Sequence, residues 1–190
     1  EIMAQKLVRP TLTLITNARV DHVDEIGATE AETLRSLCFS LTKDTVVITA
    51  EPGIEQYAKN VRRPGDAPIA ADYLKQFSYP VFIENLNLVL AVADALGIDR
   101  QTALDGMLTA QPDIGMTGPY FVGECTVVNA FAANDCRSTR QLFEQSASEL
   151  DLHKLPVQLI YNNRSDREYR LSEFVPFLKD MKGKCGRLYV

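Results

Sequence analysis

Short runs of β-branched and aliphatic residues alternate with amphipathic segments through most of this sequence, and this alternation restricts the possible folds more than any other feature. Such runs, bounded by Asn, Asp, Gly and Pro, are typical of buried strands. The pattern predicts strands at residues 11–16, 45–49, 126–131, 157–161 and 187–190. It predicts helices after Thr29, near 54–61, and over 83–96, 100–108, 138–150 and 170–181. Strands that alternate with helices indicate parallel β/α units with right-handed connections, so the predicted fold class is α/β.

Local signals fix several helix ends. Thr29 followed by Glu32 forms a capping box at the start of a helix. Gly97 suits the position just after a helix, and Asp99 can cap the next one. Residues 111–119 are rich in Pro and Gly and form the best linker in the sequence. We therefore predict a domain boundary near residue 113, with an α/β unit over 1–113 and another over 114–190.

Composition excludes several classes of protein. The formal net charge is −5 and the pI is about 5.1, which argues against nucleic acid as a partner bound by a basic surface. The four cysteines fit no zinc template and are expected to be reduced thiols. The longest apolar run, residues 81–96, is interrupted by polar and acidic side chains, so we expect no membrane span and no signal peptide in these residues.

Three polar clusters follow predicted strands, and doubly wound sheets bind ligands beyond the carboxyl ends of their strands. The first cluster, residues 16–24, places His22 near the carboxylates Asp21 and Asp24. Nitrogen and oxygen ligands together suit Mg²⁺ or Mn²⁺ when phosphates share the ion. The alternative is a loop at a strand end whose Asn and Asp side chains bond turn amides.

The second cluster, residues 129–139, precedes a predicted helix. Asp135 could hold a ribose hydroxyl or a metal-bound water, and Arg137 could meet a phosphate. Ser138 and Thr139 open the helix, whose first amides attract anions. The alternative is that Asp135 or Ser138 only caps the helix.

The third cluster, residues 162–167, again lies between a predicted strand and a predicted helix. Arg164 and Arg167 flank Asp166 and could clamp the phosphates or the sugar of a nucleotide, since guanidinium groups match phosphate oxygens. The alternative is an exposed turn with a weak local ion pair. These residues contain no G-x-S-x-G, H-E-x-x-H, G-x-G-x-x-G or G-x-x-x-x-G-K-S/T motif.

The first cluster resembles the signature of Mur ligases and folylpolyglutamate synthases, T-N-x-x-x-D-H-x-D followed by glycine. Here it reads Thr-Asn-Ala-Arg-Val-Asp-His-Val-Asp over residues 16–24, with Gly27 behind it. The resemblance implies that His22 helps to hold the Mg²⁺ that bridges ATP and the acyl substrate. Arg19 and residues 7–11 look more like the ligase subunits of poly-γ-glutamate synthases in capsule biosynthesis than like cell-wall peptide ligases.

Three later segments agree in order and spacing. Residues 82–99 are similar to the family helix that ends in A-L-G-I-D, with Asn85 at the position that lies by the nucleotide and Leu88 where the family has a second asparagine. Residues 129–135 resemble the N-x-F-A-A-N-D segment, and residues 163–167 resemble the C-terminal R-x-D-R that faces the nucleotide. The resemblance implies that nucleotide is bound by Asn85, Asp135, Arg164, Asp166 and Arg167, and that Arg137 meets phosphate or the acidic substrate as a catalytic residue.

The resemblance covers residues 7–181 and implies a specific domain order. Residues 1–113 would be the end of a Mur-ligase-like central ATPase domain, and 114–190 an incomplete, Rossmann-like C-terminal domain. The implied activity is an ATP-dependent amide ligation in which a carboxylate becomes an acyl phosphate and the amine of glutamate then attacks it. ATP and Mg²⁺ are the implied cofactors. Glutamate, the poly-γ-glutamate chain and the membrane subunits of a polymer synthase are the implied partners, at the cytoplasmic face of the inner membrane.

Two other interpretations stay open. A Mur-type or folylpolyglutamate ligase would share the chemistry but take a different substrate. A non-catalytic module would keep the ligase fold without a phosphate loop. We expect the phosphate loop of an active ligase in a preceding segment, so these residues alone should bind nucleotide weakly and show no turnover.

Overall fold

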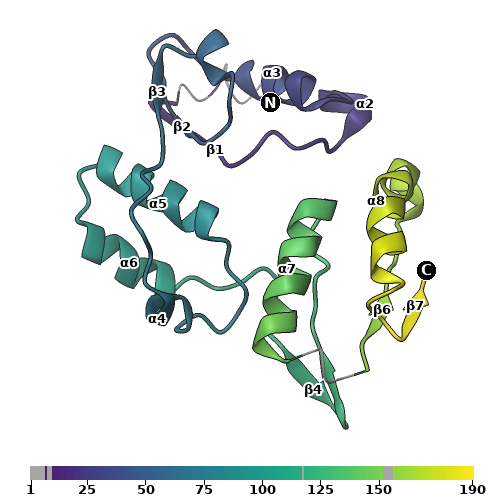
Figure 1. Cartoon of the computed structure of the whole chain (residues 1–190). Helices are drawn as coiled ribbons and strands as arrows, with labels where there is room; N and C mark the ends of the chain where they lie inside the picture. Colours follow the sequence, from purple (N-terminus) through teal and green to yellow (C-terminus); the bar gives the residue numbers. More distant parts are fainter. Residues whose placement is uncertain (1–6, 8–9, 117, 152–155) are drawn as a thin grey trace. The chain divides into compact units, whose positions relative to one another are not determined.

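The chain divides into two compact units. The structure is a computed structural model that describes residue 7 and residues 10–116, 118–151 and 156–190. Its units are Glu1–Gln111 and Pro112–Val190 (Figure 1), a division close to the predicted boundary at residue 113. Each unit has its own sheet, helices and apolar core, and each is described by itself.

A parallel sheet forms the centre of the first unit. Its strands are β1 (Leu12–Ile15), β2 (Val46–Thr49) and β3 (Asn60–Arg62), in the order β1-β2-β3. Both neighbouring pairs are parallel, with Ile15 opposite Thr49 and Ile48 opposite Arg62. Branched residues dominate the central strand β2, as expected for a strand that is covered on both faces.

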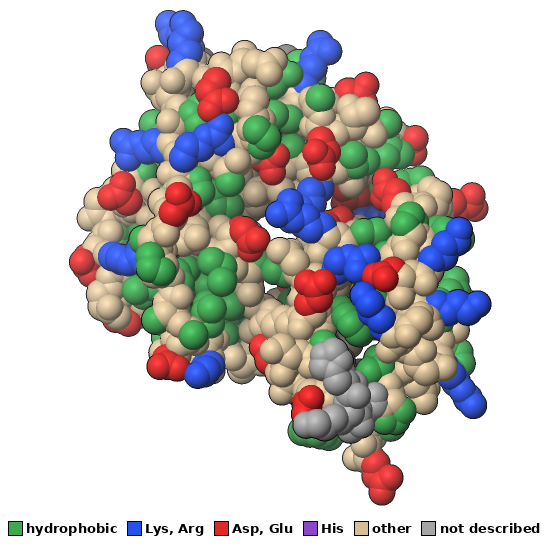
Figure 2. Space-filling model, viewed as in Figure 1, with side chains coloured by type: hydrophobic (Ala, Val, Ile, Leu, Met, Phe, Trp, Pro, Cys, Tyr) green, Lys and Arg blue, Asp and Glu red, His purple; other side chains and the backbone are tan. Residues whose placement is uncertain are grey.

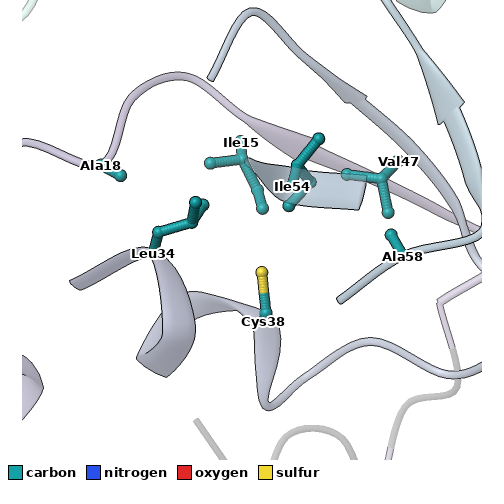
Figure 3. Packing of buried hydrophobic residues seen from close by; sticks show 7 residues of the cluster. All are labelled: Ile15, Ala18, Leu34, Cys38, Val47, Ile54 and Ala58. Atoms are coloured by element: carbon teal, nitrogen blue, oxygen red, sulfur yellow. The ribbon is translucent and has the colours of Figure 1, made fainter. Parts of the chain in front are cut away.

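One face of this sheet is covered by helix α3 (Glu30–Cys38). Thr29 and Glu32 form the predicted capping box: the Glu32 amide donates to the Thr29 hydroxyl at 3.2 Å, and the Thr29 amide donates to the Glu32 carboxylate at 3.1 Å. Figure 3 shows apolar side chains from the strands and the helix pointing toward one another. This core comprises Ile15, Ala18, Leu34, Cys38, Val47, Ile54 and Ala58.

The opposite face is covered by helix α5 (Ile83–Ala95), which contacts β2. Side chains alternate along a strand, so Ile48 points away from the core that holds Val47, and both residues are fully buried. Helix α6 (Arg100–Leu108) packs on α5 around a smaller core of Leu90, Ala93 and Ala103. The Asp99 carboxylate accepts from the Thr102 amide at 3.0 Å, so the predicted cap is confirmed.

Three short elements complete the first unit. Helix α2 (Val23–Ile26) follows β1, and helix α4 (Ala71–Leu74) precedes α5. The helix predicted near residues 54–61 is wrong: the structure has a single 3-10 turn, η1 (Ile54–Gln56), followed by strand β3. So short a segment gains more from pairing with β2, which satisfies its backbone groups, than from an isolated helix that would leave most of its terminal groups unpaired.

The second unit begins with a β-hairpin. Its strands, β4 (Tyr120–Val122) and β5 (Cys125–Val127), are antiparallel and turn through Gly123, whose φ is +59°. The predicted parallel strand over 126–131 is therefore wrong in length and pairing. The tight connection gives the physical reason, because parallel neighbours need a crossover of about a dozen residues or more. Residues 128–135 form a loop instead.

The rest of the second unit alternates as predicted. Helix α7 (Cys136–Glu149), strand β6 (Gln158–Ile160), the 3-10 turn η3 (Ser165–Arg167), helix α8 (Glu168–Met181) and strand β7 (Arg187–Tyr189) follow in order. Strands β6 and β7 are parallel neighbours. The core centres on the α8 residues Phe174, Phe177, Leu178 and Met181, with residues of α7 and both strands packed against it.

The α/β class is confirmed, with the exception of the antiparallel hairpin. The assignments to a Mur-ligase-like central domain and to a Rossmann-like C-terminal domain stay predictions. Within the described residues, no helix combines the length and the apolar character that a membrane span requires. On the face shown in Figure 2, basic and acidic side chains are interspersed, in line with the net charge of −5.

Gly27→Ala should destabilise the first unit. Gly27 has φ +123°, and an added Cβ would lie 2.3 Å from Cβ of Glu32, which is held in the capping box. We expect a loss of about 1–3 kcal/mol in the free energy of unfolding, measured by urea titration. Gly65→Ala is the matched control, because no atom lies within 4 Å of its added Cβ. Equal losses in the two variants would contradict the prediction.

Cys38 should resist thiol reagents in the folded chain, whereas the exposed Cys125 should react. Burial raises the pKa of the Cys38 thiol to about 11, so it carries little thiolate near neutral pH. Because the folded pKa is raised, the stability contributed by the neutral thiol is complete below its ordinary pKa of 9.0 and is lost as the pH rises through about 11. Mass spectrometry after brief maleimide treatment measures both thiols. Equal labelling rates would refute the prediction.

Candidate functional site

In the second unit, the predicted cluster before α7 contacts helix α8, which follows the third predicted cluster. Arg170, at the start of α8, donates from its guanidinium to Oδ1 of Asn134 at 3.4 Å, in the loop before α7. The Cys136 thiol donates to the carbonyl oxygen of Glu173 at 3.2 Å. These contacts hold the first turn of α7 against the first turns of α8, which follow the carboxyl end of β6 (Figure 1). Residues 134–139 contact α8, and residues 162–167 lead directly into it, so we treat the two segments as one candidate site.

Asp135 is the N-cap of α7. One carboxylate oxygen accepts from the Ser138 amide at 2.9 Å, and the other accepts from the Ser138 hydroxyl at 2.7 Å. The hydroxyl of Thr139 donates to the Asp135 carbonyl at 2.9 Å. The capping interpretation of this cluster is thus confirmed.

Asn163 organises the other loop of the site. Its side-chain amide donates to the carbonyl oxygens of Arg164 and Arg167, at 3.2 and 3.4 Å, and its oxygen accepts from the Tyr161 hydroxyl at 3.1 Å. Arg164 is exposed and Arg167 is half-buried. Asp166 lies in η3, and its side chain lies outside the described part of the structure. The loop thus has a fixed backbone that presents guanidinium groups at a strand end.

The electrostatics of this edge favour an anion. The N-terminal ends of α7 and α8 carry partial positive charge, and Arg137 is exposed in the first turn of α7. Burial raises the pKa of the Tyr161 hydroxyl, so it remains a neutral donor beside the loop. Burial, with Glu173 and Asp135 nearby, also raises the pKa of the Cys136 thiol. A neutral thiol is a poor nucleophile, so the raised pKa argues against cysteine chemistry at this site.

The first predicted cluster lies in the first unit, directly after β1. His22 has left-handed backbone angles, φ 49° and ψ 52°, and precedes helix α2. Its amide donates to the Asp21 carboxylate at 2.9 Å, and its Nε2 lies 3.9 Å from the other oxygen of that carboxylate. The amide of Arg19 donates to the side-chain oxygen of Asn17 at 3.1 Å. Asp21 and Asn17 therefore bond turn amides, as the alternative interpretation predicts.

These residues supply only part of a metal site. Among the described residues, no group of three His, Cys, Asp or Glu side chains could hold an ion together. Mg²⁺ commonly takes one or two protein ligands and completes its shell with water and substrate phosphates. The pair of His22 and Asp21 fits such a shared ion but not a site made of protein ligands alone.

Asn85 is exposed in the first turn of α5, and Leu88 is buried in the core. A pocket of about 670 Å³ lies along another face of this helix and does not include Asn85. No motif in the sequence indicates this pocket; its only local signal is the adjacent basic pair Arg62 and Arg63, which lines it. Its lining comprises Arg62, Arg63, Gly65, Ala67, Asn87, Leu90, Ala91, Asp94, Ile98 and Arg100.

Known proteins resemble this chain over most of its length. Residues 120–190 match the family described as the poly-gamma-glutamate synthase CapB C-terminal domain. The capsule biosynthesis protein CapB of Bacillus anthracis is 32% identical over 194 residues, which cover 94% of this chain and 42% of that protein. The PGA synthase CapB of Bacillus subtilis strain 168 is 33% identical over 187 residues, which cover 91% of this chain and 47% of that protein.

These matches place the chain among relatives of the CapB subunit of poly-gamma-glutamate synthases, so the predicted resemblance to that family is confirmed. The chain spans less than half the length of the curated relatives it matches. The wider relationship to Mur ligases stays a prediction.

Asp135→Ala should destabilise the second unit by about 0.5–2 kcal/mol, because it removes the N-cap of α7. Asp135→Asn keeps an oxygen for the Ser138 amide and should lose less. Urea unfolding measures both variants. If Asp135 also binds a nucleotide, Asp135→Asn should weaken nucleotide affinity more than its small loss of stability explains. Unchanged stability in the Ala variant would contradict the capping role.

Proposed function

We propose that this chain is part of an ATP-dependent amide ligase that adds glutamate to poly-γ-glutamate through an acyl-phosphate intermediate. The observation that carries the proposal is the similarity over more than nine-tenths of the chain to proteins named for capsule biosynthesis and PGA synthesis. The aligned region includes the loops that bear His22, Asp135 and Arg164. The anion-binding character of the site in the second unit supports the proposal.

The reaction class requires two displacements. A terminal carboxylate of the polymer attacks the γ-phosphorus of ATP, which gives an acyl phosphate and releases ADP. The amine of glutamate then attacks the acyl carbon, phosphate leaves with the bonding electrons, and the amine loses a proton as the amide forms. Most of the catalysis in such transfers is positioning and stabilisation of charge on the phosphoryl oxygens.

The residues of this chain have distinct proposed roles. Arg137 contacts the transferring phosphoryl group or the acidic substrate, helped by the first amides of α7. Asp135 accepts from a ribose hydroxyl while it caps that helix, and Arg164, Asp166 and Arg167 hold the nucleotide at the end of β6. Asn85 lies at the nucleotide by resemblance only, because its exposure on α5 neither supports nor opposes the role.

His22 would be the metal ligand of this chain. A bound Mg²⁺ would neutralise phosphate charge, and its remaining ligands would come from water and phosphate oxygens. The short distance from Nε2 of His22 to the Asp21 carboxylate favours an orientation in which both groups face a shared cation. The left-handed backbone at His22 lies directly before helix α2.

The implied partners follow from the same proposal. Glutamate and poly-γ-glutamate are the substrates, and membrane subunits of a polymer synthase would hold the ligase at the cytoplasmic face of the inner membrane. We propose no nucleic-acid partner, in keeping with the acidic pI of about 5.1.

Glutamate-dependent release of ADP tests the proposal. The full-length product of the gene that encodes this chain should form ADP only when ATP, Mg²⁺, glutamate and a poly-γ-glutamate primer are all present. Arg137→Ala should lower kcat/KM by about 100-fold to 1000-fold, as expected for the loss of a group that stabilises transition-state charge. Lys179→Ala is the control, since Lys179 lies in the last turn of α8, away from the helix start.

Three outcomes separate the alternatives. ADP release that depends on a cell-wall peptide precursor or a folate instead of poly-γ-glutamate would replace the substrate assignment. The absence of any ATP-dependent ligation by the complete gene product would favour a non-catalytic module. These 190 residues contain no G-x-x-x-x-G-K-S/T phosphate loop, so by themselves they should bind nucleotide weakly and show no turnover. Robust glutamate-dependent ADP release from them would contradict the expectation that the reaction requires such a loop.

A further inference from the structure

We propose that the pocket beside α5 binds a segment of the poly-γ-glutamate chain through its carboxylates, at a distance from the reacting end. This inference rests on the proposed function for the identity of the polymer. The pocket has a volume of about 670 Å³ and lies wholly within the first unit. None of its residues belongs to the clusters that sequence analysis selected.

Three arginines give the pocket its basic character. Arg62 ends β3, Arg63 follows it, and Arg100 begins α6. Arg63 is fixed in place, since its guanidinium donates to the carbonyl oxygens of Thr49 and Glu51, at 3.2 and 2.6 Å, and pairs with Glu55.

Arg62 and Arg100 are the arginines whose guanidinium groups can bind a ligand in place of water. Both are exposed, and neither pairs with another residue in the part of the chain that the structure describes. A guanidinium group binds a carboxylate through two parallel hydrogen bonds, which makes arginine well suited to this ligand. The two side chains therefore carry the recognition that we propose.

The rest of the lining fits a polyamide better than a nucleotide. Leu90, Ala91 and Ile98 provide apolar contact for the methylene groups of each glutamyl unit. Asn87 can both donate to and accept from an amide, and the Asp94 carboxylate can accept from an amide N–H. Nucleotide bases are commonly held against aromatic rings, and no aromatic side chain stands among the described lining residues.

The position of the pocket relates it to the predicted metal loop of the same unit. The strands of the first sheet are parallel, so their carboxyl ends lie along one edge. Arg62 stands at that edge at the end of β3, and the loop that carries His22 leaves the same edge at the end of β1. A polymer held by Arg62 would thus be retained near the edge that bears the proposed metal ligand.

Repeated carboxylates along a polymer raise its affinity for such a site. Each exposed arginine–carboxylate pair contributes little by itself and is screened by salt. A chain that carries a carboxylate on every unit can engage Arg62 and Arg100 together, and the second contact is then intramolecular. We therefore expect affinity to rise with polymer length and to fall steeply with ionic strength.

Fluorescence anisotropy with labelled poly-γ-glutamate tests the inference on the whole chain, without ATP. The double variant Arg62→Gln, Arg100→Gln should bind the polymer about tenfold more weakly or worse than the unaltered chain, because two charge-assisted contacts are lost. The matched control removes the same charge from exposed positions outside the pocket, Lys43→Gln with Lys59→Gln, and should change affinity by less than about threefold. Arg63 is left intact because it holds loop carbonyls.

Folding and competing ligands are examined in the same series. Thermal unfolding followed by circular dichroism should give the same midpoint for both double variants. If the arginine variant loses stability, Arg62→Lys with Arg100→Lys keeps the charge and should still weaken binding, because lysine lacks the planar fork. Inorganic phosphate and ATP, added at the concentration of polymer carboxylates and at an ionic strength held constant with NaCl, should not displace the polymer.

The outcomes distinguish this inference from the proposed function. Equal loss of polymer binding in the two glutamine double variants would overturn the pocket assignment, even if the complete protein proved to be a glutamate ligase. Displacement by phosphate or ATP would overturn it in favour of a phosphate site. Selective loss in the arginine variant would support the pocket, even if no glutamate-dependent ADP release were found.

Discussion

The first unit depends on the burial of its central strand, β2. Val47 and Ile48 have no exposed surface, and because they point to opposite faces, each face of the sheet requires its own covering layer. Helix α3 supplies one layer and α5 the other. A strand enclosed in this way joins parallel neighbours through helical or irregular crossovers, and all three strand ends then meet at one edge. The His22 loop and Arg62 share an edge because the three strands run in the same direction.

The second unit is organised differently, because the residues of its parallel strands β6 and β7 are exposed or half-buried. The pair β6 and β7 is parallel, and helices α7 and α8 pack around one core of aromatic and aliphatic residues. This packing brings two helix starts to the end of β6, where partial positive charges and arginines accumulate. The Asp135 carboxylate completes the backbone hydrogen bonding of α7 at the same place.

Local signals were sufficient wherever a feature depends on neighbours in sequence. The capping box of Thr29 and Glu32, the Asp99 cap and the bounds of α6 all agree with the prediction, since each is decided within one or two helical turns. The prediction of a helix near residues 54–61 was wrong because the end of this segment pairs with β2. The sequence of the segment alone does not encode that pairing. The prediction of a parallel strand at 126–131 was wrong because a short apolar run does not indicate whether its pairing is parallel or antiparallel. The structure has an antiparallel hairpin at 120–127. Which polar loop would lie against α8 was equally non-local, and the contact from Arg170 to Asn134 identifies the loop before α7.

The α5 pocket shows why a polar residue in a helix cannot be assigned a role from its motif position alone. Asn87, Leu90, Ala91 and Asp94 follow the i, i+3, i+4, i+7 spacing and so share one helical face, which lines the pocket. Asn85 stands two residues earlier, about 200° around the helix, and belongs to a different face. The resemblance points to Asn85 because it rests on positions along the sequence. The pocket instead brings the face of α5 that carries Asn87 together with Arg62, which is distant in sequence. A ligase that extends an anionic polymer has to hold the polymer as well as react with its end. Asn85 and Asn87 lie on different sides of one helix, so a polymer held against Asn87 would leave the side that carries Asn85 uncovered.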